Sequence, residues 1–174
     1  KVLEPSLLSQ LKEPLSAIRP MKAVFDPEYM RRINGPNVKT GGSKMDKAEA
    51  LMEDIENFRK TSGASRLVMI WCGSTEVFHR VTDVHLTIEK FEAGLRNNDP
   101  DIAPSQIYAY AAIKSGVPFA NGAPNLTADT PALLEFALKV ALDSARIADE
   151  DFPPLRAQGF ADEDIWDIAA IAAF

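Results

Sequence analysis

The feature that most constrains the fold is an apolar run that stops abruptly at small and polar residues. Residues 67–71 read Leu-Val-Met-Ile-Trp without alternation, and residues 73–76 read Gly-Ser-Thr-Glu. Such a run is typical of a strand buried on both faces of a parallel sheet. Ligands of open α/β sheets bind beyond the carboxyl ends of the strands, so residues 73–76 mark a first candidate binding position.

The segment before this strand has the pattern of a capped amphipathic helix. Ser43 is a predicted N-cap, Asp46 lies in the first turn, and residues 61–63 end the helix. A helix, a short turn and a buried strand form half of a crossover unit, which favours a parallel α/β arrangement. We therefore expect an α/β fold with helices flanking a parallel sheet.

A second apolar segment ends in the same way. A helix is predicted from Pro104 to its stop at Gly116, and Val117 to Ala120 then forms a short strand. This strand is followed by Asn-Gly-Ala-Pro-Asn over residues 121–125. Two neighbouring strand ends of this kind would form a crevice of hydroxyl and amide groups that could bind a nucleotide.

The remaining elements are predicted from periodicity and from turn residues. Asn, Gly and Pro dominate residues 34–42, which favours a surface loop over the alternative of a phosphate-binding loop, since neither common glycine fingerprint is present. The other expected elements are a helix over residues 5–19 that Pro14 would kink or divide, a strand from Met21 to Phe25, a short helix from Pro27 to Arg32, a helix from about Thr82 to Asn97 and a helix from Thr130.

Composition excludes some classes of function. The net charge is −6 and no basic run offsets it, which argues against nucleic-acid binding. No stretch has the length of a membrane-spanning helix. The only cysteine, Cys72, cannot form an internal disulfide, so we expect a reducing, cytoplasmic compartment. Cys72 is expected to be a packed small hydrophobe, with a reactive role as the alternative.

The two histidines give little sign of a metal site. His79 and His85 flank the same predicted loop, near Glu76 and Asp83. No pair spaced by four residues on a helix is present to hold two ligands, so solvated loop residues are expected and no metal is predicted.

Three collinear motifs are more specific. Trp71–Glu76 resembles the W-x-x-x-T-E strand end of inositol-3-phosphate synthases, also called myo-inositol-1-phosphate synthases. Ile102–Ser105 resembles their I-[SA]-P-S helix start, and Gly116–Asn125 resembles their G-V-P-[FY]-I-N-G-[ST]-P-Q-N strand and turn. The resemblance covers about residues 1–137, in the order and at the spacing of the family.

The resemblance implies a partial Rossmann-like sheet that binds NAD in a homo-oligomeric enzyme of inositol and phospholipid biosynthesis. Members convert glucose 6-phosphate to myo-inositol 1-phosphate through a transient ketone that allows an aldol ring closure. The cofactor-facing residues carried over are Ser74 and Thr75 at the first strand end, Ser105 at the helix start, and Asn121, Gly122 and Asn125 at the second strand end. For each hydroxyl or amide the alternative is a cap or a turn.

Two family features are missing. The glycine-rich dinucleotide loop G-x-G-G-N-N-G is expected upstream of Lys1, and the lysine-bearing segments around K-S-G-Q-T are also absent. No catalytic residue is therefore assigned, and Lys114 is not promoted to one. The chain starts without methionine and ends at Phe174 within an apolar helical pattern, which predicts an inactive fragment of a longer protein.

The last part of the chain departs from the family. Residues 131–174 are predicted to form a helical tail that resembles the carboxymuconolactone decarboxylase and AhpD-like family, through 155–160 and 162–169, without its Cys-x-x-Cys pair. This suggests an α/β segment over residues 1–130 joined to a fused or engineered tail, unless the likeness arose by chance. The alternative function is a structural or interaction module, an α/β scaffold with a helical hairpin and no ligand.

Overall fold

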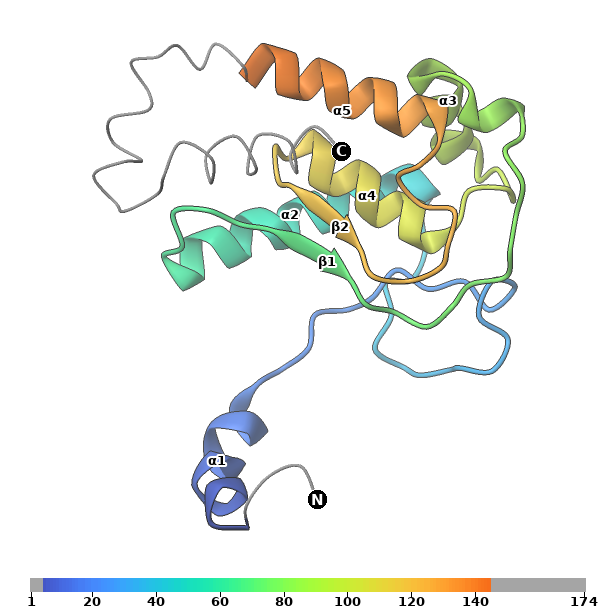
Figure 1. Ribbon diagram of the computed structural model, residues 1–174. Helices are drawn as coiled ribbons and strands as arrows, with labels where there is room; N and C mark the ends of the chain where they lie inside the picture. The colour runs from blue at the N-terminus through green and yellow to red at the C-terminus, as the bar shows by residue number, and fades with distance from the viewer. Residues whose placement is uncertain (1–4, 145–174) are drawn as a thin grey trace.

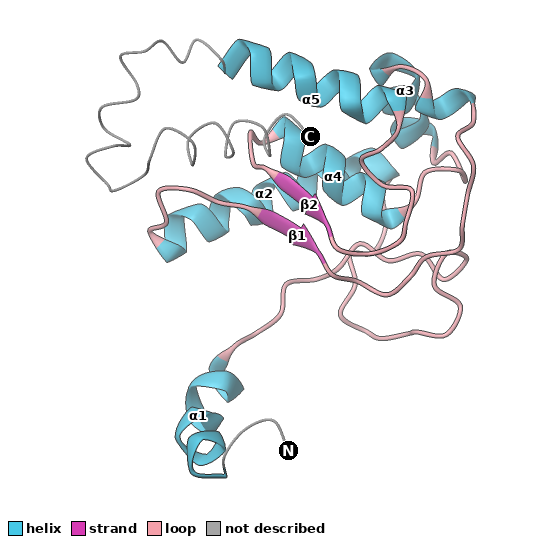
Figure 2. Ribbon diagram, viewed as in Figure 1, coloured by secondary structure: helices cyan, strands magenta, loops and turns pink. Residues whose placement is uncertain are grey.

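The computed structural model describes residues 5–144 as a small parallel sheet covered by helices (Figure 1). Figure 2 shows the same view with the helices and strands coloured by type. The elements in chain order are α1 (Pro5–Ala17), α2 (Lys44–Ser62), β1 (Met69–Trp71), the 3₁₀ helix η1 (Asp83–His85), α3 (Ile88–Asn97), α4 (Pro104–Lys114), β2 (Phe119–Asn121) and α5 (Pro131–Ser144).

The two strands are hydrogen-bonded neighbours that run parallel. Met69 pairs with Phe119, and Trp71 pairs with Asn121 at the carboxyl end. Helices α3 and α4 lie between the strands in the sequence, as a parallel connection requires. Helix α4 contacts both strands as well as α2 and α5, and so forms the centre of the fold (Figure 1). The predicted parallel α/β arrangement is confirmed.

Helix α2 begins and ends where the sequence predicts. The Ser43 side chain accepts a hydrogen bond from the Asp46 backbone N–H (3.1 Å), and the Asp46 carboxylate accepts one from the Ser43 backbone N–H (2.6 Å). This is a reciprocal capping box. At the other end Gly63 adopts the left-handed conformation (φ 65°) that only glycine adopts readily.

The core is formed mainly by α4 and the helices around it. Ala109, Ala111 and Ala112 are completely buried, and these small side chains allow close packing of α4 against its neighbours. The largest buried apolar side chains of the core are Phe91, Leu95, Ile102, Ile107, Tyr110 and Leu133. None of the described helices is long and apolar enough to span a bilayer.

The apolar run at the first strand is buried on one face only, contrary to the sequence prediction. Leu67, Met69 and Trp71 are half-buried, whereas Val68 and Ile70 are 64% and 62% exposed. The reason is tertiary, because the described helices that contact the strands cover only one face of the sheet.

Two predicted elements near the N-terminus are wrong. Residues 21–25 form no strand, and Ala23 makes an isolated parallel bridge to Val38. Residues 27–32 contain turns instead of a helix. The residues after Pro20 direct their backbone hydrogen bonds to the predicted loop 34–42, with Ala23 donating to the Asn37 carbonyl (3.0 Å). That loop is confirmed as irregular.

Helix α1 is confirmed and runs through Pro14 without division. It lies apart from the rest of the described chain in Figure 1 and has no buried residue. Helix α3 is preceded by η1, so the helix predicted from about Thr82 is interrupted. Helix α4 starts at the predicted Pro104, and α5 starts at Pro131, one residue after the predicted Thr130. The part of the predicted helical tail beyond residue 144 lies outside the described residues.

Candidate functional site

The carboxyl ends of β1 and β2 meet at one edge of the sheet, where the polar segments 73–76 and 121–125 begin. Beyond the last strand pair, the Gly122 backbone N–H donates to the Trp71 carbonyl at 2.8 Å. The Glu76 backbone N–H donates to the Asn125 side-chain oxygen at 3.1 Å. The two segments are therefore joined by hydrogen bonds at one edge of the sheet, and the predicted nucleotide-binding crevice between them stays a prediction.

The six predicted cofactor-binding residues differ in accessibility. Ser74, Thr75, Asn121 and Gly122 are exposed and Asn125 is half-buried, whereas Ser105 is completely buried. The Asn121 side chain also shapes its own turn, because it donates to the Asn125 carbonyl (3.1 Å) and accepts from the Ala123 backbone N–H (3.1 Å). The assignment of all six to a cofactor stays a prediction.

Glycines make the two strand ends compact. A Cβ atom on Gly73 would lie 2.7 Å from the Trp71 ring, and one on Gly122 would lie 2.9 Å from the Trp71 carbonyl oxygen. A side chain on Gly122 would force the two segments apart, so their close approach requires glycine at this position, whereas a side chain on Gly73 would clash with the Trp71 ring of its own segment. Cys72 is exposed beside them, and the prediction of a packed Cys72 is wrong because the thiol lies on the uncovered part of the strand end.

The sequence did not reveal that Glu76 is a buried carboxylate at this edge. Its side chain is only 6% exposed, and its carboxylate accepts hydrogen bonds from the Ser105 backbone N–H (2.9 Å), the Ser105 hydroxyl and the Asn125 amide (3.3 Å). Burial raises the pKa of Glu76, and the hydrogen bonds from Ser105 oppose that rise. The signal available in the sequence was the glutamate of the W-x-x-x-T-E motif itself.

Ser105 occupies the first turn of α4, directly after Pro104. Its backbone N–H points out of the helix N-terminus, where a negative charge is favoured, and Glu76 supplies that charge. The Thr127 hydroxyl in turn donates to the Ser105 hydroxyl at 3.0 Å. The donors of Ser105 that were expected to face a cofactor are thus directed to Glu76.

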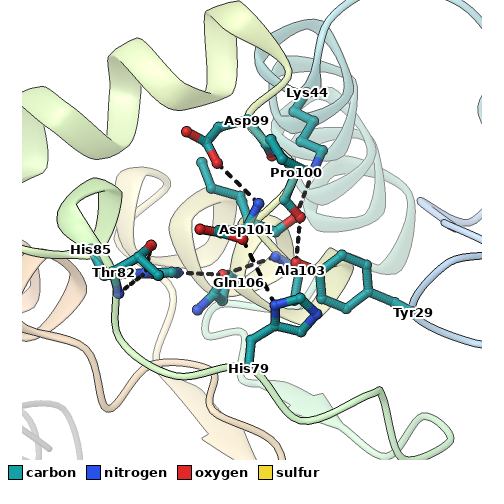
Figure 3. A network of polar contacts seen from close by, with 11 residues as sticks. Tyr29, Lys44, His79, Thr82, His85, Asp99, Pro100, Asp101, Ala103 and Gln106 are labelled. Carbon is teal, nitrogen blue, oxygen red and sulfur yellow. Dashed lines mark hydrogen bonds and ion pairs between the residues drawn. The ribbon is translucent and has the colours of Figure 1, made fainter.

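A second polar network holds the turn that leads into α4, and Figure 3 shows it from close by. The Lys44 ammonium group donates to the carbonyls of Asp99 (2.6 Å) and Ile102 (2.7 Å). The Tyr29 hydroxyl donates to the Pro100 carbonyl (2.6 Å), and the Tyr29 ring stacks on His79 with 4.6 Å between centroids. Lys44 is 8% exposed, and burial lowers its pKa.

His85 is completely buried, so its prediction as a solvated loop residue is wrong. Its Nδ1 accepts from the Thr82 backbone N–H (3.1 Å), which leaves Nε2 to donate to the Gln106 side-chain oxygen at 3.3 Å (Figure 3). The same oxygen accepts from the Ala103 backbone N–H (2.9 Å). His85 therefore supports the start of α4. Within residues 5–144, no three metal-ligating side chains come together.

Residues 1–154 match the family model described as myo-inositol-1-phosphate synthase, which represents an NAD-binding domain. The chain belongs to this family. It is 38% identical to inositol-3-phosphate synthase 1 of Bacteroides thetaiotaomicron over 138 residues, which are 79% of this chain and 32% of that protein. It is 30% identical to inositol-3-phosphate synthase 1 of Oryza sativa subsp. japonica over 142 residues, 80% of this chain and 28% of that protein.

A solved structure shares the fold. The crystal structure of inositol-3-phosphate synthase from Caenorhabditis elegans matches with a TM-score of 0.74 at 26% identity, over 80% of this chain and 28% of that chain. The Rossmann-like fold class and the resemblance over the N-terminal segment are confirmed. The chain spans about a third of the length of the relatives it matches.

The boundary between residues 130 and 131 stays a prediction. The family match extends past it to residue 154. In the described part of α5, Ala132 and Leu133 are completely buried, and α5 packs against α3 and α4. The segments 155–160 and 162–169, which carry the AhpD-like resemblance, lie outside the described residues.

Proposed function

We propose that this chain forms part of an NAD-dependent synthase that converts glucose 6-phosphate to myo-inositol 1-phosphate, and that it supplies one edge of the cofactor site. The single observation that carries the proposal is the pairing of Trp71 with Asn121, which brings both polar strand ends together. Family membership is consistent with this ligand, because the matching model represents an NAD-binding domain.

The residues of this edge suit the nicotinamide and ribose half of the cofactor. Ser74 and Thr75 offer exposed hydroxyls, and Asn121 offers an exposed amide. Gly122 leaves its backbone open to close approach because it lacks a side chain. A bound NAD would supply the acceptor for a hydride from the sugar phosphate and would allow its later return. The chain's own residues bind and orient, and the oxyanion-stabilising lysines would come from elsewhere in the protein.

The isolated chain would bind the cofactor through this edge but would not catalyse the reaction. Ser74, Thr75, Asn121, Gly122 and Asn125 would contact the cofactor, and Ser105 would act indirectly. We infer no turnover by this chain alone, since no catalytic residue is assigned to it. The parent enzyme would be a cytoplasmic homo-oligomer, and the exposed apolar side chains of Val68 and Ile70 are consistent with a sheet face that is covered in a larger assembly.

An NMR titration of the ¹⁵N-labelled chain tests the proposal, because chemical shifts detect even millimolar binding. We expect NAD and nicotinamide mononucleotide to shift the amides of residues 73–76 and 121–125, and we expect adenosine monophosphate to leave them unchanged. Thr75→Ala and Asn121→Ala should weaken binding. Asn97→Ala, on an exposed face of α3, is the matched control.

The alternative is a ligand-free scaffold or interaction module. No shift at these amides with millimolar NAD would favour that alternative and contradict the proposal. Equal shifts with nicotinamide mononucleotide and adenosine monophosphate would show that this edge does not recognise the nicotinamide half.

A further inference from the structure

Glu76 connects three segments that are far apart in the sequence. It follows β1, it binds the first turn of α4 through Ser105, and it binds the segment after β2 through Asn125. The pair Glu76 and Asn125 is doubly bonded, because the Glu76 backbone N–H donates to the Asn125 side-chain oxygen (3.1 Å) while the Asn125 amide donates to the Glu76 carboxylate (3.3 Å). This arrangement fixes the orientation of the Asn125 side chain.

The network requires a carboxylate at position 76. Three donors converge on its two oxygens: the Ser105 N–H, the Ser105 hydroxyl and the Asn125 amide. An amide at position 76 would place its own N–H groups either against the Ser105 backbone N–H or against the Asn125 amide, and either orientation leaves a buried donor without an acceptor. The Glu76 carboxylate also lies at the N-terminus of α4, so the Ser105 donors are not available to an anionic ligand.

We propose that Glu76 is a positioning residue whose carboxylate locks segment 73–76 against segment 121–127 and thereby maintains the cofactor-facing edge. This inference rests on the proposed function. Its side chain is 6% exposed, so it acts through its neighbours and does not contact the ligand itself. The exposed residues on either side, Thr75 and Asn121, depend on this lock for their relative position.

The lock is tested without any ligand by hydrogen exchange of the ¹⁵N-labelled chain. The reporter is the Gly122 amide, which bridges the two strand ends through the Trp71 carbonyl. We expect Glu76→Gln to speed its exchange by about tenfold or more, the factor that corresponds to losing hydrogen bonds to a buried charged acceptor. The Met69 amide, which donates to the Pro118 carbonyl at the other end of the strands, should keep its rate relative to the amides of α2.

The matched control is Glu92→Gln. Like Glu76, Glu92 accepts a hydrogen bond from a buried hydroxyl, that of Tyr110 (2.8 Å). Glu92 is partly buried and lies on α3, away from the two strand ends. This variant should lose stability without selectively faster exchange at Gly122.

A double variant separates the lock from general destabilisation. In Glu76→Gln with Asn125→Asp the amide and the carboxylate exchange places, so the side chains can pair again across the two segments. We expect the double variant to recover most of the Gly122 protection that Glu76→Gln loses. A purely local packing defect at position 76 would not be repaired by changing Asn125.

The outcomes distinguish this inference from the proposed function. The lock would be overturned if the Gly122 amide of Glu76→Gln exchanged no faster than in the wild type. It would also be overturned if the double variant did not recover the protection of that amide. Faster exchange together with about tenfold weaker NAD binding, measured by the amide shifts above, would support it. Faster exchange in a chain whose wild type shows no NAD-induced shift would support the lock and overturn only the proposed function.

Discussion

Replacing Gly122 by alanine is expected to destabilise the strand-end edge through one identifiable contact. The new Cβ would lie 2.9 Å from the Trp71 carbonyl oxygen, which is also the acceptor of the Gly122 N–H at 2.8 Å. Gly122 does not have a positive φ, so alanine can adopt the backbone conformation. The contact with the carbonyl therefore decides the outcome, and the two backbones must separate.

The magnitude follows from three contributions. Overpacking of this kind costs about 1–3 kcal/mol, and weakening of a backbone hydrogen bond costs about 0.5–1.5 kcal/mol. Replacing glycine by alanine restricts the unfolded chain and returns about 0.4–1 kcal/mol. The central values of these contributions give a net loss of about 2 kcal/mol in the free energy of unfolding, because the carbonyl belongs to a paired strand and cannot rotate away.

Urea denaturation followed by circular dichroism measures this loss. With an m value of about 2 kcal/mol/M, the midpoint should fall by about 1 M. Gly35→Ala is the control, because nothing lies within 4 Å of its new Cβ and its φ is not positive, so its midpoint should not fall. A Gly122→Ala midpoint equal to or above that of Gly35→Ala would refute the steric argument.

Two further predictions concern the first turn of helix α2. Lys44→Met should lower the free energy of unfolding by about 2 kcal/mol, measured by urea denaturation. Two hydrogen bonds from a charged donor are lost, and the relief of the desolvation of the ammonium group offsets only part of that loss. An unchanged midpoint would contradict this prediction. The Ser43 backbone N–H and hydroxyl hold the pKa of Asp46 below its usual value, so its carboxylate stabilises the fold above the usual pKa and loses this effect as pH falls through the lowered pKa. Asp46→Asn should therefore be less stable than wild type at pH 7, and the difference should disappear in acid; a difference in midpoint that is independent of pH would contradict the assignment.

Elements with local signals were predicted correctly from the sequence. Ser43 and Asp46 lie three residues apart and satisfy each other, and Gly63 ends the same helix with a conformation that depends on its own backbone. Pro104 and Gly116 bracket α4 and the turn that follows it in the same way. The three collinear motifs identified the family for a similar reason, since residue types and spacings are properties of the sequence.

Exposure and long-range contacts were decided by the tertiary structure. Val68 and Ile70 are as apolar as their neighbours, and their exposure reflects the one-sided helical layer. Glu76 is buried because its partners Ser105 and Asn125 come from positions 29 and 49 residues further along the chain. Periodicity and capping act over a few residues, whereas the burial of a side chain depends on whichever distant segments pack over it.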